Sequence, residues 1–173
     1  PVRSPPDKLA QCESIQLRYF QISTDKSHDL EILTLLGEGS FGAVYKASHK
    51  SGSIVAVKVI PHGTVSSSED QKIMGEIDIL SRCDSPYIVG YFECFIREAT
   101  SNKPSEMWIV MEYCEGGSMT DLIEARAGQP LREECVRAVC ASIVLGLEYL
   151  HGVANVCHRD IKCGNVLLTE DGH

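Results

Sequence analysis

The first half of the chain alternates short apolar runs with polar turns that contain glycine. From residue 29 onward, the runs 30–36, 43–48 and 53–60 are rich in β-branched and aromatic side chains. Runs of this kind, separated by glycine-containing turns, are typical of β-strands. Because the three strands follow one another without a long crossover, the pattern predicts an antiparallel meander.

The period of the pattern then becomes helical and afterwards returns to that of strands. Isoleucine and leucine recur every three or four residues across 67–83, behind a Ser-Glu-Asp sequence that suits the start of a helix. The apolar runs 87–96 and 107–114 predict two further strands, joined by a polar loop. The sequence therefore predicts five strands and one helix in this part of the chain.

After two adjacent glycines, Gly116 and Gly117, the helical period persists. Residues 118–127 begin with Ser-x-x-Asp, a capping signal, and residues 130–152 predict a longer helix. The longer helix carries one apolar stripe, formed by Val136, Val139, Cys140, Ile143, Leu147 and Leu150. The pattern predicts a helical region that meets the strands at the glycine pair.

Composition and charge narrow the classes of function. With 43% hydrophobic and 23% charged residues, the chain has the composition of a globular protein. Its 173 residues are enough to bury one core or two small lobes. A net charge of −8 repels a phosphate backbone, so we expect no nucleic-acid partner. The longest apolar run, 138–150, is interrupted by polar residues and is too short to cross a bilayer, so we expect no membrane insertion.

The amino-terminal residues 1–28 mix proline, serine and charged residues, and predict a loosely structured extension. From the start on Pro1 we expect a chain that is processed, freed from a tag or cut from something longer, and no basic stretch leads into an apolar one as in a secretory signal. The eight cysteines form no C-x-x-C pair. This usage favours reduced thiols in a cytoplasmic protein over a disulfide framework.

The stretch GEGSFGAVYKA places Gly37, Gly39 and Gly42 in the spacing G-x-G-x-x-G. Glycines at this spacing let backbone N–H groups approach phosphate oxygens. A dinucleotide-binding fold is excluded by context, because a strand follows instead of a helix. A glycine-rich hairpin without a ligand has the same spacing, so this motif alone leaves both interpretations open.

Lys58 lies within the apolar run VAVK. Strand alternation places it on the same face as Ala56 and Ile60, which favours a buried partner for its charge. The predicted helix offers Glu69 and Glu76 as partners. Either glutamate, taken alone, is more typically a solvated helix charge.

The stretch HRDIKCGN brings an acid, a cation and an amide into one short turn. Asp160 can accept a proton, Asn165 can bind a hard cation through its amide oxygen, and Lys162 can neutralise a phosphate. A metal site formed by the histidine and two cysteines of 157–163 is a weaker alternative, because zinc ligands normally come from two places in the chain. A Cys-His-Asp nucleophilic site is equally weak, since such triads are rarely adjacent in sequence.

In their order and spacing, the glycine loop, VAVK, a helix glutamate, WIVMEYC and HRDIKCGN resemble a eukaryotic protein kinase over residues 29–173. Lys162 resembles the serine/threonine type. The stretches CDSPYIV, WIVMEYCEGGSMTDL and HRDIKCGNVLLTEDGH are most similar to the sterile-twenty-like group, which includes the mammalian sterile-twenty-like and germinal-centre kinases. The resemblance implies an α+β, bilobal fold with a five-stranded antiparallel small lobe and one helix (29–115). The first helices and the catalytic loop of an incomplete large lobe would follow (116–173).

The resemblance also implies a binding site for ATP. The glycine loop would cover the phosphates, and Lys58 would contact them while paired with Glu76, which we prefer to Glu69 because EIDIL matches the family's helix motif. Met111 would be the gatekeeper before the adenine-binding hinge. The implied contacts are Gly37, Glu38, Gly39, Ser40, Phe41, Gly42, Val44, Ala56, Lys58, Glu76, Met111, Glu112, Cys114, Ser118 and Asp121, the last two at the ribose.

For the reaction itself, the resemblance implies that Asp160 orients and deprotonates the substrate hydroxyl. Lys162 would approach the γ-phosphate, and Asn165 would bind Mg²⁺. The family continues after this point into an Asp-Phe-Gly motif, whereas the given residues supply only Glu170 and Asp171. We therefore expect an ATP- and Mg²⁺-dependent serine/threonine kinase for protein substrates, in a piece that is inactive by itself.

The alternative is a catalytically dead nucleotide-binding or scaffold module. Scaffold, activator or chaperone partners are expected with either interpretation.

Overall fold

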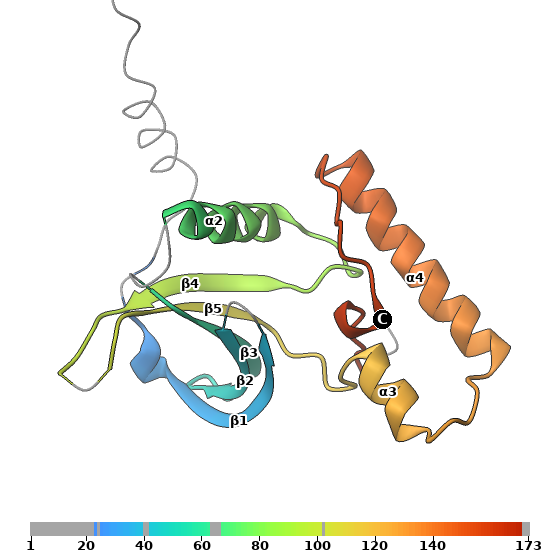
Figure 1. Ribbon diagram of the computed structural model, residues 1–173, viewed down its shortest axis with the longest axis horizontal. Coiled ribbons are helices and arrows are strands. Elements are labelled where there is room, and N and C mark those ends of the chain that lie inside the picture. Colours follow the sequence, from blue (N-terminus) through green and yellow to red (C-terminus); the bar gives the residue numbers. More distant parts are fainter. Residues whose placement is uncertain (1–22, 24, 40–41, 63–66, 102, 171–173) are drawn as a thin grey trace, which may run out of the picture.

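The computed structural model describes residue 23 and residues 25–39, 42–62, 67–101 and 103–170 (Figure 1). The side chains of residues 67–71 are outside this description. A twisted sheet with one helix forms the first part, and two helices with the last segment of the chain form the second (Figure 1). One segment that follows the last strand joins the two parts. This arrangement confirms the predicted α+β fold.

The elements follow the predicted order, with boundaries that differ by a few residues. The sheet consists of β1 (Leu30–Gly39), β2 (Gly42–His49), β3 (Ile54–Pro61), β4 (Tyr91–Arg97) and β5 (Glu106–Glu112). The helices are η1 (Ser27–Asp29), α2 (Ser67–Arg82), α3 (Met119–Ala125), α4 (Glu133–Gly152) and η2 (Cys163–Asn165), of which η1 and η2 are 3₁₀ turns.

The strand order is β1-β2-β3-β5-β4, so the antiparallel meander predicted for the first three strands is confirmed, and the fifth strand precedes the fourth in the sheet. All pairs are antiparallel, but β3 pairs with β5, so β4 lies at an edge. The fourth strand also begins later than predicted, at Tyr91. The preceding apolar residues form a turn in which the N–H of Ile88 donates to the carbonyl of Ser85. An apolar run cannot distinguish a strand from a buried turn by itself.

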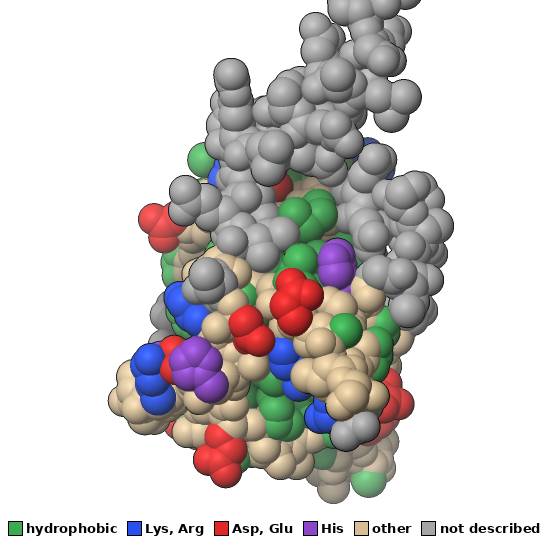
Figure 2. Space-filling model, turned by 90° about the vertical axis from the view of Figure 1, so that its left-hand side faces the viewer, with side chains coloured by type: hydrophobic (Ala, Val, Ile, Leu, Met, Phe, Trp, Pro, Cys, Tyr) green, Lys and Arg blue, Asp and Glu red, His purple; other side chains and the backbone are tan. Residues whose placement is uncertain are grey.

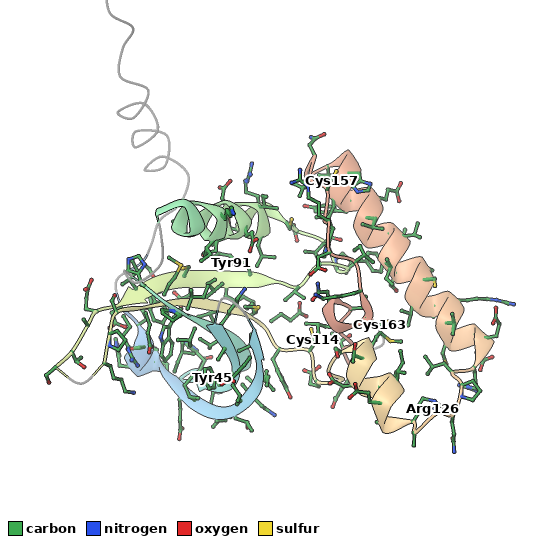
Figure 3. The ribbon with its side chains drawn as sticks, in the orientation of Figure 1. Tyr45, Tyr91, Cys114, Arg126, Cys157 and Cys163 are labelled. Carbon is green, nitrogen blue, oxygen red and sulfur yellow. The ribbon has the colours of Figure 1, made fainter. Side chains whose placement is uncertain are left out.

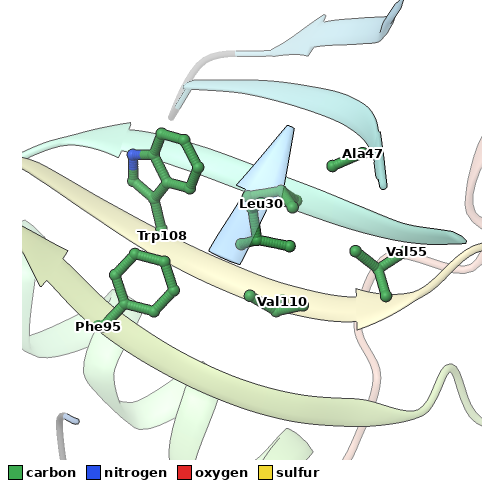
Figure 4. Close-up of a cluster of buried hydrophobic side chains, with 7 residues drawn as sticks. Leu30, Ala47, Val55, Phe95, Trp108 and Val110 are labelled. Carbon is green, nitrogen blue, oxygen red and sulfur yellow. The ribbon is translucent and has the colours of Figure 1, made fainter. Parts of the chain in front are cut away.

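Two hydrophobic clusters lie on opposite faces of the sheet. On the face away from α2, Phe95 and Trp108 pack with a ring-centroid distance of 5.8 Å, and both side chains are buried (Figure 4). The other members of this cluster are Leu30, Ala47, Val55, Val57 and Val110. Because neighbouring side chains in a strand point to opposite faces, the alternate residues of β3 and β5 are free to face α2.

On the second face, α2 packs onto the sheet through Ile73 and Ile77. These side chains contact a cluster formed by Ile60, Cys94, Met107 and Ile109. Burying several such side chains stabilises the domain by about 1.5–3 kcal/mol each. The apolar residues whose spacing predicted the helix are therefore the ones that hold it on the sheet.

A short segment before β1 is fastened to two parts of the sheet. The N–H of Ser23 donates to the carbonyl of Cys94, and the ammonium of Lys26 lies 2.5 Å from the Glu93 carboxylate on the edge strand β4. Asp29 forms an ion pair of 2.7 Å with Lys50, beyond the end of β2. Most of the extension predicted to be loosely structured, 1–28, lies outside the described residues, which include only residues 23 and 25–28 of it, and the domain boundary at residue 28 stays a prediction.

The carboxyl half of α4 packs on the loop between α2 and β4, because Gly146 lies close to Tyr87 and the hydroxyl of Tyr149 accepts from the N–H of Asp84 at 2.8 Å. Leu150 is buried, whereas Val136 near the amino end is 39% exposed. The apolar stripe is thus covered at one end and open at the other.

By length and composition alone, α4 is apolar enough to cross a membrane, and 11% of its most apolar window is buried. The apolar run used in the sequence argument covers only part of this 20-residue helix. The same composition is found in core helices of soluble proteins, so the expectation of no membrane insertion stays a prediction.

At the end of the sheet that faces the viewer in Figure 2, basic, acidic and hydrophobic side chains are interspersed. The described part of that face carries no continuous basic patch. The expectation of no nucleic-acid partner stays a prediction.

Candidate active site

The glycine loop joins β1 to β2 as a hairpin in which Gly39 pairs with Gly42. Gly42 has a φ of 139°, and a Cβ there would lie 2.1 Å from the carbonyl oxygen of Val59. Gly37 has no atom within 4 Å of such a Cβ. Glu38 is exposed beside the hairpin end, while Ser40 and Phe41 are outside the described residues. One glycine of the motif is thus required by close packing on β3.

The register of β2, β3 and β5 brings several predicted residues onto one face. Val44 lies opposite Lys58, which lies opposite Ile109 in the cluster beneath α2. Ala56 lies opposite Met111 in the neighbouring row. Since opposite residues in an antiparallel pair share a face, these side chains are on the face that α2 covers in part. The alternation in the sequence predicted this face for Lys58.

Lys58 is half-buried, and among the described residues no ion pair involves its ammonium. Glu76, its predicted partner, is exposed on α2, although the next residue, Ile77, is buried against the sheet. The structure therefore does not bring Lys58 and Glu76 into an ion pair. The side chain of Glu69, the alternative partner, lies outside the described residues.

The hinge begins where β5 ends. The Glu112 carboxylate accepts a hydrogen bond of 2.9 Å from the N–H of Gly90, and the N–H of Glu112 donates to the carbonyl of Gly90. Cys114, labelled in Figure 3, lies in the segment that joins the two parts. Burial, with help from the charges of Glu112 and Glu115, raises the pKa of the Cys114 thiol to about 11. The thiol is therefore protonated and weakly nucleophilic at neutral pH.

Ser118 and Asp121 form the capping box of α3 that the sequence predicted. The Asp121 carboxylate accepts from the hydroxyl of Ser118 at 2.6 Å and from its N–H at 2.8 Å. The N–H of Asp121 donates back to the Ser118 hydroxyl. The hydrogen bonds from Ser118 lower the pKa of Asp121. Capping occupies both side chains, and contact with a ribose stays a prediction.

The hinge contacts residues 166–168, and the sequence analysis did not predict this contact. The N–H of Gly116 donates to the carbonyl of Leu168, the N–H of Leu168 donates to the carbonyl of Gly117, and the N–H of Met119 donates to the carbonyl of Val166. A Cβ at Gly116 would lie 2.8 Å from Leu168. The apolar run after Asn165 was the available signal for this pairing, which fixes the catalytic loop to the hinge.

The catalytic loop gathers the three residues that the sequence singled out. Lys162 forms an ion pair with Asp160 at 2.9 Å. The amide nitrogen of Asn165 donates to the carboxylate and to the backbone carbonyl of Asp160, both at 2.8 Å. The hydrogen bond from Lys162, followed by that from Asn165, lowers the pKa of Asp160. Asp160 is thus an exposed, oriented carboxylate at neutral pH.

The alternative metal site is not formed by the described residues. These residues contain no group of three or more histidine, cysteine or acidic side chains that could hold a metal ion. Cys157 lies near the carboxyl end of α4, whereas Cys163 lies beside α3 (Figure 3). The cysteines that the structure describes are free thiols. Glu170 is exposed, and Asp171 lies outside the described residues.

The donor atoms present fit a nucleotide with Mg²⁺. The amide nitrogen of Asn165 is occupied by Asp160, so the amide oxygen of Asn165 is the atom of this side chain that could bind a cation. Amide and carboxylate oxygens are ligands that Mg²⁺ prefers. Lys58 offers an ammonium without an ion-pair partner among the described residues, as a phosphate site requires.

Comparison with known families agrees with this geometry. The family model described as the protein kinase domain matches residues 30–173. The match begins at the first strand and extends through the hinge and the catalytic loop. The chain therefore belongs to the protein kinase domain family, in which phosphate is transferred from ATP to protein substrates.

Proposed function

We propose that this chain is part of a serine/threonine kinase of the sterile-twenty-like group that acts with ATP and Mg²⁺. The observation that carries the proposal is the ion pair of Lys162 with Asp160, in a loop where the resemblance implies a serine/threonine kinase. A cation at this position can offset the negative charge of the transferred phosphate while Asp160 contacts the acceptor hydroxyl. Protein substrates, activator or scaffold partners and a cytoplasmic location belong to the same proposal.

In the proposed reaction, each charged or polar residue of the site has its own role. Mg²⁺-ATP, when bound, supplies the phosphoryl group and neutralises part of its charge. Lys58 holds the phosphates on the sheet side, and Asn165 offers an oxygen ligand for Mg²⁺ on the loop side. Asp160 orients the acceptor hydroxyl and receives its proton. Lys162 offsets negative charge on the transferred group.

We expect a polypeptide of these 173 residues to transfer no phosphate by itself. They contain no Asp-Phe-Gly motif, and phosphoryl transfer depends on that magnesium-binding aspartate and on the substrate-binding half of the domain. The measurement is incorporation of labelled phosphate into a generic basic protein. Incorporation that disappears in the Asp160→Asn variant would contradict the expectation.

ATP affinity should depend on Lys58 more than on Asp160. Lys58 meets the phosphates in the ground state, whereas Asp160 acts on the acceptor hydroxyl. A charge-assisted hydrogen bond contributes about 1.5–3 kcal/mol, so Lys58→Met should weaken ATP binding by about tenfold or more. Asp160→Asn should change it by less than about twofold. Calorimetric titration with Mg²⁺-ATP measures both.

The matched control is Lys103→Met, which removes an exposed lysine from the loop between β4 and β5. It should leave the affinity unchanged, since its charge is solvated. Equal weakening by Lys58→Met and Asp160→Asn, in variants with unchanged urea unfolding, would show that the assigned roles are wrong.

A further inference from the structure

An interaction outside the predicted site links β2 to the hinge. The ammonium of Lys46 lies 4.6 Å from the centroid of the Tyr113 ring. Lys46 is in β2, and Tyr113 follows β5 directly. An ammonium within about 6 Å of an aromatic ring centroid is attracted by the electrons of the ring face. Among the described residues, no ion pair involves Lys46, and its ammonium contacts the Tyr113 ring instead.

The register shows why this interaction concerns the nucleotide face. Lys46 lies opposite Ala56, and Ala56 lies opposite Met111. The neighbouring row contains Val44 and Lys58. Side chains that lie opposite one another share a face, so Lys46 is on the face of Lys58, one row closer to the hinge.

The described part of β2 does not pair with the strand that leads into the hinge. In the sheet order, β3 lies between β2 and β5, so β2 makes its ladder hydrogen bonds with β1 and β3. Lys46 and Tyr113 reach across β3 beside Ala56, whose side chain is small. The pair therefore joins the strand that follows the glycine loop to the segment where the base of a nucleotide would lie.

We propose that Lys46 and Tyr113 form a latch that determines how tightly the adenine end of the pocket retains its ligand. The inference rests on the proposed nucleotide binding. While the latch is closed, β2 stays seated on the hinge and the base is enclosed between them. When it is broken, the β1–β2 hairpin lifts more easily and the nucleoside leaves faster. Lys46 and Tyr113 thus act as positioning residues.

Adenosine is the discriminating probe because it carries no charge. Lys46→Met removes a positive charge, which weakens attraction for ATP at a distance even if no latch exists. Such an effect leaves adenosine binding unchanged, whereas loss of the latch weakens adenosine and ATP alike. We expect Lys46→Met and Tyr113→Leu each to weaken adenosine binding by about two- to fivefold.

The double variant tests whether the two residues act as one unit. If they form a latch, Lys46→Met with Tyr113→Leu should weaken adenosine binding no more than either single substitution. If Tyr113 instead contacts the nucleoside independently, the two losses should multiply. Lys46→Arg and Tyr113→Phe retain the cation and the ring, so both should keep the wild-type affinity.

Calorimetric titration of the full 173-residue chain with adenosine and with Mg²⁺-ATP gives every value needed. Unchanged adenosine affinity in Lys46→Met, or multiplied losses in the double variant, overturns the latch while leaving the proposed function intact. A wild-type chain that binds neither ligand overturns nucleotide binding by this chain and the latch with it. Lys103→Met serves again as the control for loss of a lysine charge.

Discussion

Replacing Gly42 with alanine should lower the free energy of unfolding by about 3 kcal/mol. The added Cβ would lie 2.1 Å from the carbonyl oxygen of Val59, and the φ of 139° is one that side chains with a Cβ rarely adopt. The hairpin must therefore shift away from β3 or change its backbone conformation. Urea unfolding followed by the fluorescence of Trp108, the single tryptophan, measures the loss.

Gly37→Ala is the matched control, because no atom lies within 4 Å of its added Cβ. It belongs to the same motif but should change the free energy of unfolding by less than about 1 kcal/mol. Hydrogen exchange at β1 and β2 amides separates local opening of the hairpin from unfolding of the whole sheet. Equal stability of the two variants would contradict the close packing of Gly42 on Val59.

The strands and helices could be predicted from the sequence because each is specified by its own period. The pairing of β3 with β5 could not. Every strand presents apolar side chains to at least one cluster, so the local pattern does not state which strands are neighbours. Likewise, the apolar residues before Tyr91 satisfied a strand pattern, although they form a turn that contacts α4.

The candidate site also has a part that is specified locally in the sequence and a part that depends on packing between distant residues. Asp160, Lys162 and Asn165 lie within six residues, so a short turn brings them together and the sequence was sufficient to find them. Pairing of Lys58 with Glu76 depends instead on the position of α2 relative to the sheet. The seating of Ile77 fixes that position, and it leaves Glu76 exposed.

The links between the site's parts are contacts across long sequence distances. Residues 166–168 pair with the hinge, and Lys46 reaches Tyr113 across β3. The apolar run after Asn165 indicates an extended segment but not its partner, and no periodic signal in the sequence indicates the contact of Lys46 with Tyr113. The glycine motif shows the same limit, since its spacing treats as equivalent two positions, Gly37 and Gly42, that differ completely in packing.

In the small lobe, we expect substitutions in the hydrophobic cluster on the face away from α2 to reduce stability the most. Phe95→Ala is expected to lower the free energy of unfolding by about 3–5 kcal/mol. The Phe95 side chain is completely buried, and its ring packs 5.8 Å from that of Trp108 (Figure 4). Its removal leaves a cavity against β5, the strand that leads into the hinge. ATP affinity should fall as the folded fraction falls.

Phe92 provides a control within the same strand. It lies three residues before Phe95 but is 58% exposed, so Phe92→Ala removes the same atoms without opening a cavity. We expect this variant to lose less than about 1 kcal/mol. Urea unfolding at matched conditions compares the two, and the m-value shows whether the amount of surface exposed on unfolding is unchanged. Equal losses of unfolding free energy at both positions would mean that the Phe95–Trp108 cluster does not hold the sheet together. The residues that stabilise the sheet next to the hinge would then be those on the face covered by α2.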